Sequence, residues 1–135
     1  MTARTNPTHF TGLICEDVRQ EVGNKLTFVG VIPGGIVNIP PSAPQAIVLA
    51  LSFVFIFADG DGEFSAQFRL IGPGGQIGTP LTSPAVKKIP DEPMVSAFQF
   101  KPLPPLTRGA YKAQVELAGQ TYDLPFLIRD EPTRH

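Results

Sequence analysis

Few residues of this chain have the chemistry of a catalytic site. The 135-residue sequence holds two histidines, His9 near the start and His135 at the end, and one cysteine, Cys15. A serine or cysteine nucleophile needs a neighbouring base that a third group orients. Neither histidine has such a context, and the apolar residues before Cys15 indicate a buried structural thiol. The sequence therefore predicts that the protein is not an enzyme.

Three carboxylates alternate around a glycine-rich turn. Asp59, Asp61 and Glu63 surround Gly60 and Gly62. Calcium takes oxygen ligands from flexible loops, so a cation site is one interpretation. The longer ligand run of an EF-hand is absent, and Asp-Gly pairs favour hairpin turns for conformational reasons alone. We therefore predict a turn, with no metal and no cofactor.

A second acidic group lies among basic residues. Glu16 and Asp17 are followed by Arg19, Glu21 and Lys25. Paired carboxylates can perform acid–base chemistry when one of them is desolvated. Here the nearby cations are close enough to neutralise them. We predict that Asp17, Arg19 and Lys25 have a structural role, as ion pairs that fix the register of a first hairpin.

The composition excludes several classes of partner and location. The net charge is -1 and the sequence pI is about 6.1, which provides no basic surface for nucleic acid or anionic membranes. A single cysteine can form no internal disulfide, which suits a reducing compartment. The polar N-terminus does not resemble a signal peptide. The apolar run 46–58 is shorter than the ~20 residues of a membrane-spanning helix. We expect a soluble cytoplasmic protein.

The sequence pattern predicts a series of short strands. Fifteen prolines and thirteen glycines divide it into pieces too short for long helices. Between them, apolar and polar residues alternate with a period of two, which is typical of half-buried strands. The predicted strands are 8–18, 26–32, 46–58, 63–71, 94–101, 109–118 and 120–129, with a short extra one at 35–39. We interpret 79–93 as a polar, proline-rich crossover.

These elements predict one domain. After a proline-rich corner, Gly109 and Tyr111 open a strand in the manner of the tyrosine corner of immunoglobulin-like sandwiches, where the phenol bonds to the chain upstream. We predict an all-β fold over 1–135: a single antiparallel, immunoglobulin-like β-sandwich of seven to eight strands. The ends, 1–7 and 130–135, are expected to fray.

The strand 46–58 is apolar on both faces. One face carries large residues that belong in a core. The other face lacks the polar residues that a two-layer sandwich normally exposes to water. Either 79–93 or 33–45 covers this second face, or a partner does. A homodimer would bury it most simply. The predicted interface consists of Val48, Ala50, Ser52, Val54 and Ile56.

Two stretches of the chain resemble a known family. The run ICEDVRQEVGNKLTFVGVIPGGI has an acidic strand end, a turn like Gly-Lys-Leu and a strand that ends in glycine. The C-terminal half has a corner rich in proline and leucine, a Gly-x-Tyr strand and a glycine hairpin. In both of these stretches, the chain is similar to a family of small bacterial proteins of unknown function. The resemblance implies an immunoglobulin-like β-sandwich and carries over no activity. Asn24 and Arg108 depart from the pattern.

The function expected from these observations is a non-catalytic protein-interaction or scaffolding module that associates with itself. The alternative is a domain that binds a small ligand or carbohydrate through its end loops. The absence of tryptophan and the presence of only two tyrosines weaken this alternative. A third hypothesis, an enzyme that uses Glu16 and Asp17, is the least supported.

Overall fold

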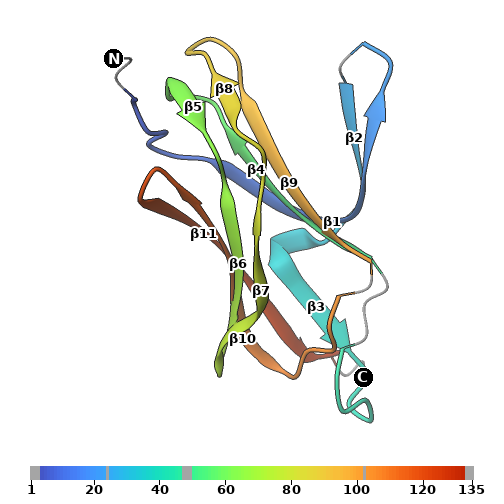
Figure 1. Cartoon of the computed structure of the whole chain (residues 1–135). Helices are drawn as coiled ribbons and strands as arrows, with labels where there is room; N and C mark the ends of the chain where they lie inside the picture. The colour runs from blue at the N-terminus through green and yellow to red at the C-terminus, as the bar shows by residue number, and fades with distance from the viewer. Residues whose placement is uncertain (1–3, 24, 47–49, 102, 133–135) are drawn as a thin grey trace.

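A computed structural model describes residues 4–23, 25–46, 50–101 and 103–132. It shows an all-β sandwich of two packed sheets, as predicted (Figure 1). The first sheet has the order β2 (Lys25–Val31), β1 (Thr11–Glu21), β4 (Leu51–Phe57), β9 (Met94–Phe100). The second has the order β3 (Ile36–Ile39), β11 (Gln120–Asp130), β10 (Gly109–Leu117), β6 (Gln67–Gly72), β7 (Gly75–Thr82). A separate ribbon pairs β5 (Gly62–Phe64) with β8 (Val86–Lys88), and a short 3-10 turn, η1, spans Pro33–Gly35.

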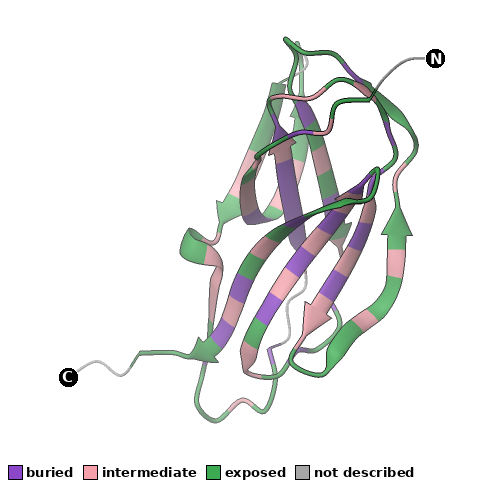
Figure 2. Cartoon of the chain, turned by 90° about the vertical axis from the view of Figure 1, so that its left-hand side faces the viewer, coloured by how far each residue is buried: buried purple, intermediate pink, exposed green. Residues whose placement is uncertain are grey.

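The core lies between the sheets and is centred on β4. Phe53, Phe55 and Phe57 alternate along this strand and are fully buried. The ring of Phe53 lies 5.4 Å from that of Phe126 on β11, and the ring of Phe57 lies 5.0 Å from that of Tyr122. On the second sheet, buried residues alternate with more exposed ones, which gives the banded strands of Figure 2. This is the period of two that the sequence predicted.

The predicted count of seven to eight strands is wrong, because the described residues form eleven. The predicted strand 63–71 is divided at Ser65 and Ala66 into β5 and β6. The predicted crossover 79–93 instead contains the end of β7 and all of β8. Polar edge strands lack the apolar alternation on which the prediction relied, and this explains why β7 was missed. Of the predicted strand 46–58, β4 covers Leu51–Phe57, Ala46 forms a single bridge to Leu106, and 47–49 lie outside the described residues.

The sandwich is not purely antiparallel. The short predicted strand near 35–39 exists as β3, and it pairs in parallel with β11. The segment 33–45 therefore extends the second sheet, and β7 does the same at the other edge. Neither 33–45 nor 79–93 adds a strand layer over the outer face of β4.

The proline-rich corner has the backbone contact expected of a tyrosine corner. The hydroxyl of Tyr111 donates a hydrogen bond of 2.6 Å to the carbonyl of Thr107, four residues upstream. Gly109 has φ +147°, and a Cβ there would lie 2.8 Å from the ring of Pro73. A side chain at position 109 would therefore be strained and crowded. Leu103 and Leu106 anchor the corner in the core.

The start of the described chain is held against the body. The fraying expected of 1–7 and 130–135 stays a prediction, and 1–3 and 133–135 lie outside the described residues. Thr5 pairs with Asp61 through two backbone hydrogen bonds of 2.8 and 2.9 Å. Pro7 is fully buried, and its carbonyl accepts a hydrogen bond of 2.5 Å from Tyr122. At the other end, Asp130 closes β11. Among the described residues, no helix is long and apolar enough to span a membrane.

The tyrosine corner should be measurable in the stability of the protein. Tyr111→Phe keeps the buried ring and removes the hydroxyl, so unfolding in urea should show a loss of about 1 kcal/mol. Thr107→Ala is the matched control: it leaves the Thr107 carbonyl in place and removes only the 3.3 Å contact between the Thr107 and Tyr111 hydroxyls, so it should change stability by no more than about 0.5 kcal/mol. Equal effects of the two changes would contradict a special role for this hydrogen bond.

Candidate functional site

Among the described residues, His9 and Asp59 meet at the hydroxyl of Thr8, whereas Cys15 forms a separate contact. His9 Nδ1 lies 2.8 Å from the hydroxyl of Thr8, at the entry to β1, and His135 lies outside the described residues. Cys15 is fully buried, and its thiol donates a hydrogen bond to the carbonyl of Asp17 at 3.3 Å. Burial raises the pKa of the Cys15 thiol, so the reactive thiolate is disfavoured. His9 and Cys15 each take part in a local structural contact.

The three alternating carboxylates have separate environments. Asp59 accepts hydrogen bonds from the hydroxyl and the backbone N–H of Thr8, and these bonds lower the pKa of its carboxyl. Asp61 pairs with Thr5 through its backbone, and Glu63 lies opposite Lys87 in the β5–β8 ribbon. In the part of the chain that the structure describes, no group of three or more acidic, histidine or cysteine side chains could share a metal ion.

The acidic cluster of the first hairpin forms a contact across the sheet. Gln99 on β9 donates a hydrogen bond of 2.7 Å to the carboxylate of Asp17 on β1, so this bond spans the intervening strand β4. Arg19 and Lys101 lie 3.3 and 3.8 Å from the same carboxylate. The Gln99 amide, followed by the Arg19 guanidinium, holds the pKa of Asp17 below its ordinary value. Lys25 forms no ion pair within the described residues, so the register of the hairpin does not depend on it.

The outer face of the first sheet is apolar. Residues paired across neighbouring strands share a face, so Ser52, Val54 and Ile56 of β4 lie beside their partners on β1 and β9. We call this surface the apolar face. At its centre are the buried residues Cys15, Ser52 and Val54, and around them are Leu13, Val29, Val31, Ile56, Val95 and Ala97. Val31, at 51%, and Val95, at 38%, are exposed, as is Ala97.

The predicted interface is only partly available on this surface. Ser52 and Val54 are fully buried within a single chain, Ala50 and Ile56 are half-buried, and Val48 lies outside the described residues. The exposed apolar atoms come instead from β2 and β9, whose strands the sequence placed without assigning them to this face. The Ser52 hydroxyl is buried without a hydrogen-bond partner in the described structure, which costs stability.

The outer face of the second sheet has the opposite character. Its side chains form a polar network in which Arg69 lies 3.4 Å from Glu116 and Gln114 donates a hydrogen bond of 2.9 Å to Asp123. Lys112 lies 3.5 Å from the same aspartate. Charges of both signs alternate over this sheet, as is usual for a sheet face in water. The two outer faces of the sandwich are therefore chemically distinct.

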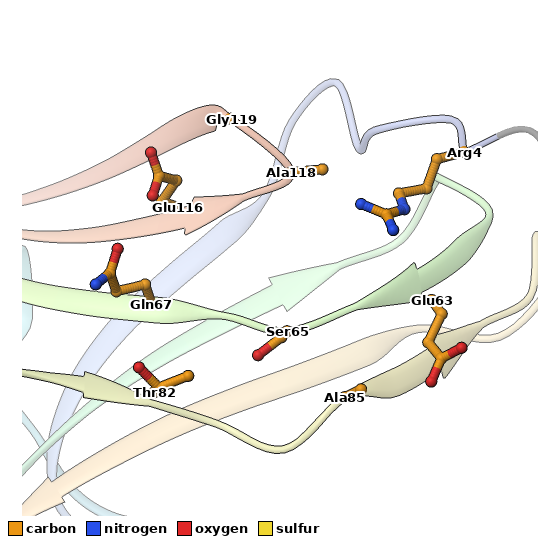
Figure 3. Close-up of a pocket in the computed structure, with 9 residues that line it drawn as sticks. All are labelled: Arg4, Glu63, Ser65, Gln67, Thr82, Ala85, Glu116, Ala118 and Gly119. Atoms are coloured by element: carbon orange, nitrogen blue, oxygen red, sulfur yellow. The ribbon is translucent and has the colours of Figure 1, made fainter.

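A polar hollow lies at one end of the sandwich (Figure 3). It encloses about 540 Å³, between β5, the ends of β6 and β7, and the turn that joins β10 to β11. Arg4 reaches toward this turn from the N-terminal segment. Gln67 accepts a hydrogen bond from Arg69, and Ser65 donates one to the carbonyl of Ser83, so part of the polar lining is already engaged.

One buried cation was not predicted from the sequence. Lys88 on β8 is 1% exposed, and its ammonium donates hydrogen bonds to the carbonyls of Ile89, at 2.6 Å, and Gly60, at 3.3 Å. A lysine is almost never fully buried unless it is paired, and its neighbour Lys87 is exposed. Because Lys88 is closed to solvent, it holds the turn before β5 against β8 rather than offering a binding group.

A scan against protein-family models and a search of curated proteins each found no match to this chain. The resemblance to small bacterial proteins therefore stays a prediction.

The buried ammonium of Lys88 should contribute measurably to the stability of the fold, although Lys88 lies in a polar segment. Lys88→Met keeps most of the stem volume and removes two charge-assisted hydrogen bonds, so urea unfolding should show a loss of about 1.5–3 kcal/mol. The matched control is Lys87→Met on the exposed neighbour, which should stay within about 0.5 kcal/mol of the wild type. If Lys88→Met leaves the free energy of unfolding unchanged, the two carbonyls do not need the ammonium as a partner.

The Asp17 contact should make stability depend on pH. Because the pKa of Asp17 is lowered in the folded state, its contribution is present above the ordinary value of 3.8 and is lost as the pH falls through the folded value. We expect Asp17→Asn to lower Tm clearly at about pH 6 and much less at about pH 2. Asp91→Asn, at an exposed position, provides the control. A difference in Tm between Asp17→Asn and the wild type that does not change with pH would contradict this role of the Asp17 carboxylate.

Proposed function

We propose that this protein is a non-catalytic interaction or scaffolding module that associates with itself through its four-stranded sheet. One observation supports this proposal above the others: the contrast between its two outer faces. Both belong to the same sandwich, yet the second sheet carries a polar network and the first carries the apolar face. Apolar patches at the surface of a sheet commonly mark contact sites for proteins.

The chemistry-bearing side chains are consistent with this role. Cys15 is buried, Asp17 holds β1 to β9, and Asp59 holds the N-terminal segment. Each contributes to the rigidity of the sandwich. A cytoplasmic location and kinship with the small bacterial proteins described above belong to the same proposal. The free thiol of Cys15 supports the first, and the two sequence stretches support the second.

The polar hollow favours a second candidate function, the binding of a small polar ligand. The guanidinium of Arg4 forms no ion pair within the described residues, and the lining adds hydroxyl and amide groups from Thr82 and Gln67. Because the carboxylates of Glu63 and Glu116 also line the hollow, these groups fit a small uncharged molecule rich in hydroxyl groups, such as a carbohydrate. A ligand at 100 times its dissociation constant would stabilise the fold by about 2.7 kcal/mol, which a thermal shift assay would detect.

The main proposal is tested by the solution mass and by the apolar face itself. Light scattering over a concentration series should give the wild type a mass above the 14.5 kDa of one chain. The wild type should also bind a fluorescent hydrophobic dye, and Val95→Asp should weaken this binding because it places a charge within the apolar face. A mass of one chain at every concentration would contradict self-association.

The matched control places the same charge on the other sheet. Thr121→Asp changes an exposed position on β11 and should leave dye binding unchanged. Equal loss of dye binding in the two variants would show that the dye does not bind at the apolar face, and would remove the observation that supports the proposal.

A further inference from the structure

The β1–β2 hairpin extends beyond the sandwich. The pairing of β1 with β4 covers Thr11–Cys15, whereas 17–21 of β1 pair with 25–29 of β2 and with no other strand among the described residues. We call this two-stranded ribbon, 17–21 with 25–29, the arm. Figure 1 shows it as the blue hairpin that rises clear of the rest of the molecule.

The arm has two chemically different sides. Side chains alternate along each strand, so Val18, Leu26 and Phe28 lie on one side, while Asp17 and Arg19 lie on the other. Leu26 is 39% exposed, and Val18 and Phe28 are half-buried. An isolated two-stranded ribbon is marginal in water, and three or more strands are needed for independent stability. The arm would therefore gain stability from additional strands.

The outer edges of β2 and β9 are the open edges of the first sheet. An unpaired edge strand presents free N–H and C=O groups, and natural proteins block such edges with proline, bulges or short length. On the second sheet, β7 contains Pro80 and a register shift, and β3 has four residues and ends at Pro40. On the first sheet, β2 and β9 each have seven residues, no proline and a constant register with their one neighbour. They differ in support: 25–29 of β2 pair with β1 alone, beyond the body of the sheet, whereas β9 pairs with β4 along its whole length. Within β2, Gly30 has φ +66°, at the base of the arm.

We propose that β2 pairs antiparallel with β2 of a second copy of this chain, about a two-fold axis near Phe28. This inference rests on the proposed function, because it identifies the surface through which the module associates with itself. Pairing joins the two first sheets into one continuous sheet and converts each arm from a two-stranded ribbon into part of a four-stranded one. Two-fold pairs dominate homo-oligomers, and their interfaces must be self-complementary.

The charges along β2 and its neighbour meet this requirement. Lys25 is the one charged residue of β2, and pairing about Phe28 places it opposite Val31 of the second copy rather than opposite another lysine. Asp17 at the base of the arm lies on the same side of the ribbon as Lys25. Antiparallel pairing brings Lys25 of one arm toward Asp17 of the other. Lys25 has no ion pair within the described residues of a single chain.

The size of the contact sets its strength. The range 16–32 supplies fewer residues than the roughly 20–30 per side of a standard stable interface. We therefore expect a weak dimer whose population rises with protein concentration. In this dimer the two apolar faces lie side by side on one surface of the joined sheet, which doubles the contact area for another protein.

Single cysteine substitutions test the pairing directly. Cross-strand neighbours have Cβ atoms about 4.5–5.5 Å apart, so only a residue at the axis can form a disulfide with its own copy. We expect Phe28→Cys to give a disulfide-linked dimer under mild oxidation with diamide. Thr27→Cys and Val29→Cys, one residue away, should react less, because each step separates the pair by a further ~6.6 Å. The native Cys15 is buried and should not react.

The controls are Val95→Cys on β9, the other edge of the first sheet, and Thr121→Cys on the second sheet. Thermal unfolding of each reduced variant verifies the fold, and the variants at 27 and 29 locate the axis if Phe28→Cys does not fold. Cross-linking that peaks within 26–30 supports the inference.

The remaining outcomes separate this inference from the proposed function. A wild-type dimer by light scattering, with cross-linking at Val95→Cys or at none of these positions, overturns the β2 pairing and leaves self-association standing. A wild-type mass of one chain at every concentration overturns both.

Discussion

The row of phenylalanines on β4 is the constraint on which the rest of the structure depends. Phe53, Phe55 and Phe57 alternate on one side of this strand, and burial of each large side chain contributes about 1.5–3 kcal/mol. They can be buried only if a second sheet closes over them, and Phe126 and Tyr122 of β11 do so. The strand pairings on both sides of β4 and the path of the N-terminal segment over Tyr122 follow from this closure.

A strand buried in this way has an outer side, and here that side is apolar as well. Ser52 and Val54 are buried although the described residues form no further strand layer over them, because neighbouring side chains close over small residues. The Gln99–Asp17 hydrogen bond contributes to this closure where it crosses β4. The apolar character therefore reaches solvent at the rim, through Val31 and Val95, and this rim is what the sandwich can offer to a partner.

The same Asp17 also marks the point where the hairpin leaves the body. From this residue onward, β1 has a partner on one side only among the described residues. The contact with Gln99 ties the base of the arm to the far edge of the sheet, so the arm starts from a fixed position. A fixed base with a free edge is a suitable geometry for strand addition, because less conformational freedom is lost on pairing.

The sequence by itself determined the all-β class, most strand positions, the inward side of β4 and the corner at Tyr111, because these depend on alternation and turn chemistry within a few residues. It missed β7 and β8, whose edge position removes the alternation, and it assigned the exposed interface to β4. Only the tertiary structure decided which sheet each strand joins, that Asp17 pairs with Gln99 rather than Lys25, and that Lys88 is buried. Each of these depends on contacts between residues far apart in the sequence, and burial is set by such neighbours and not by the type of the residue itself.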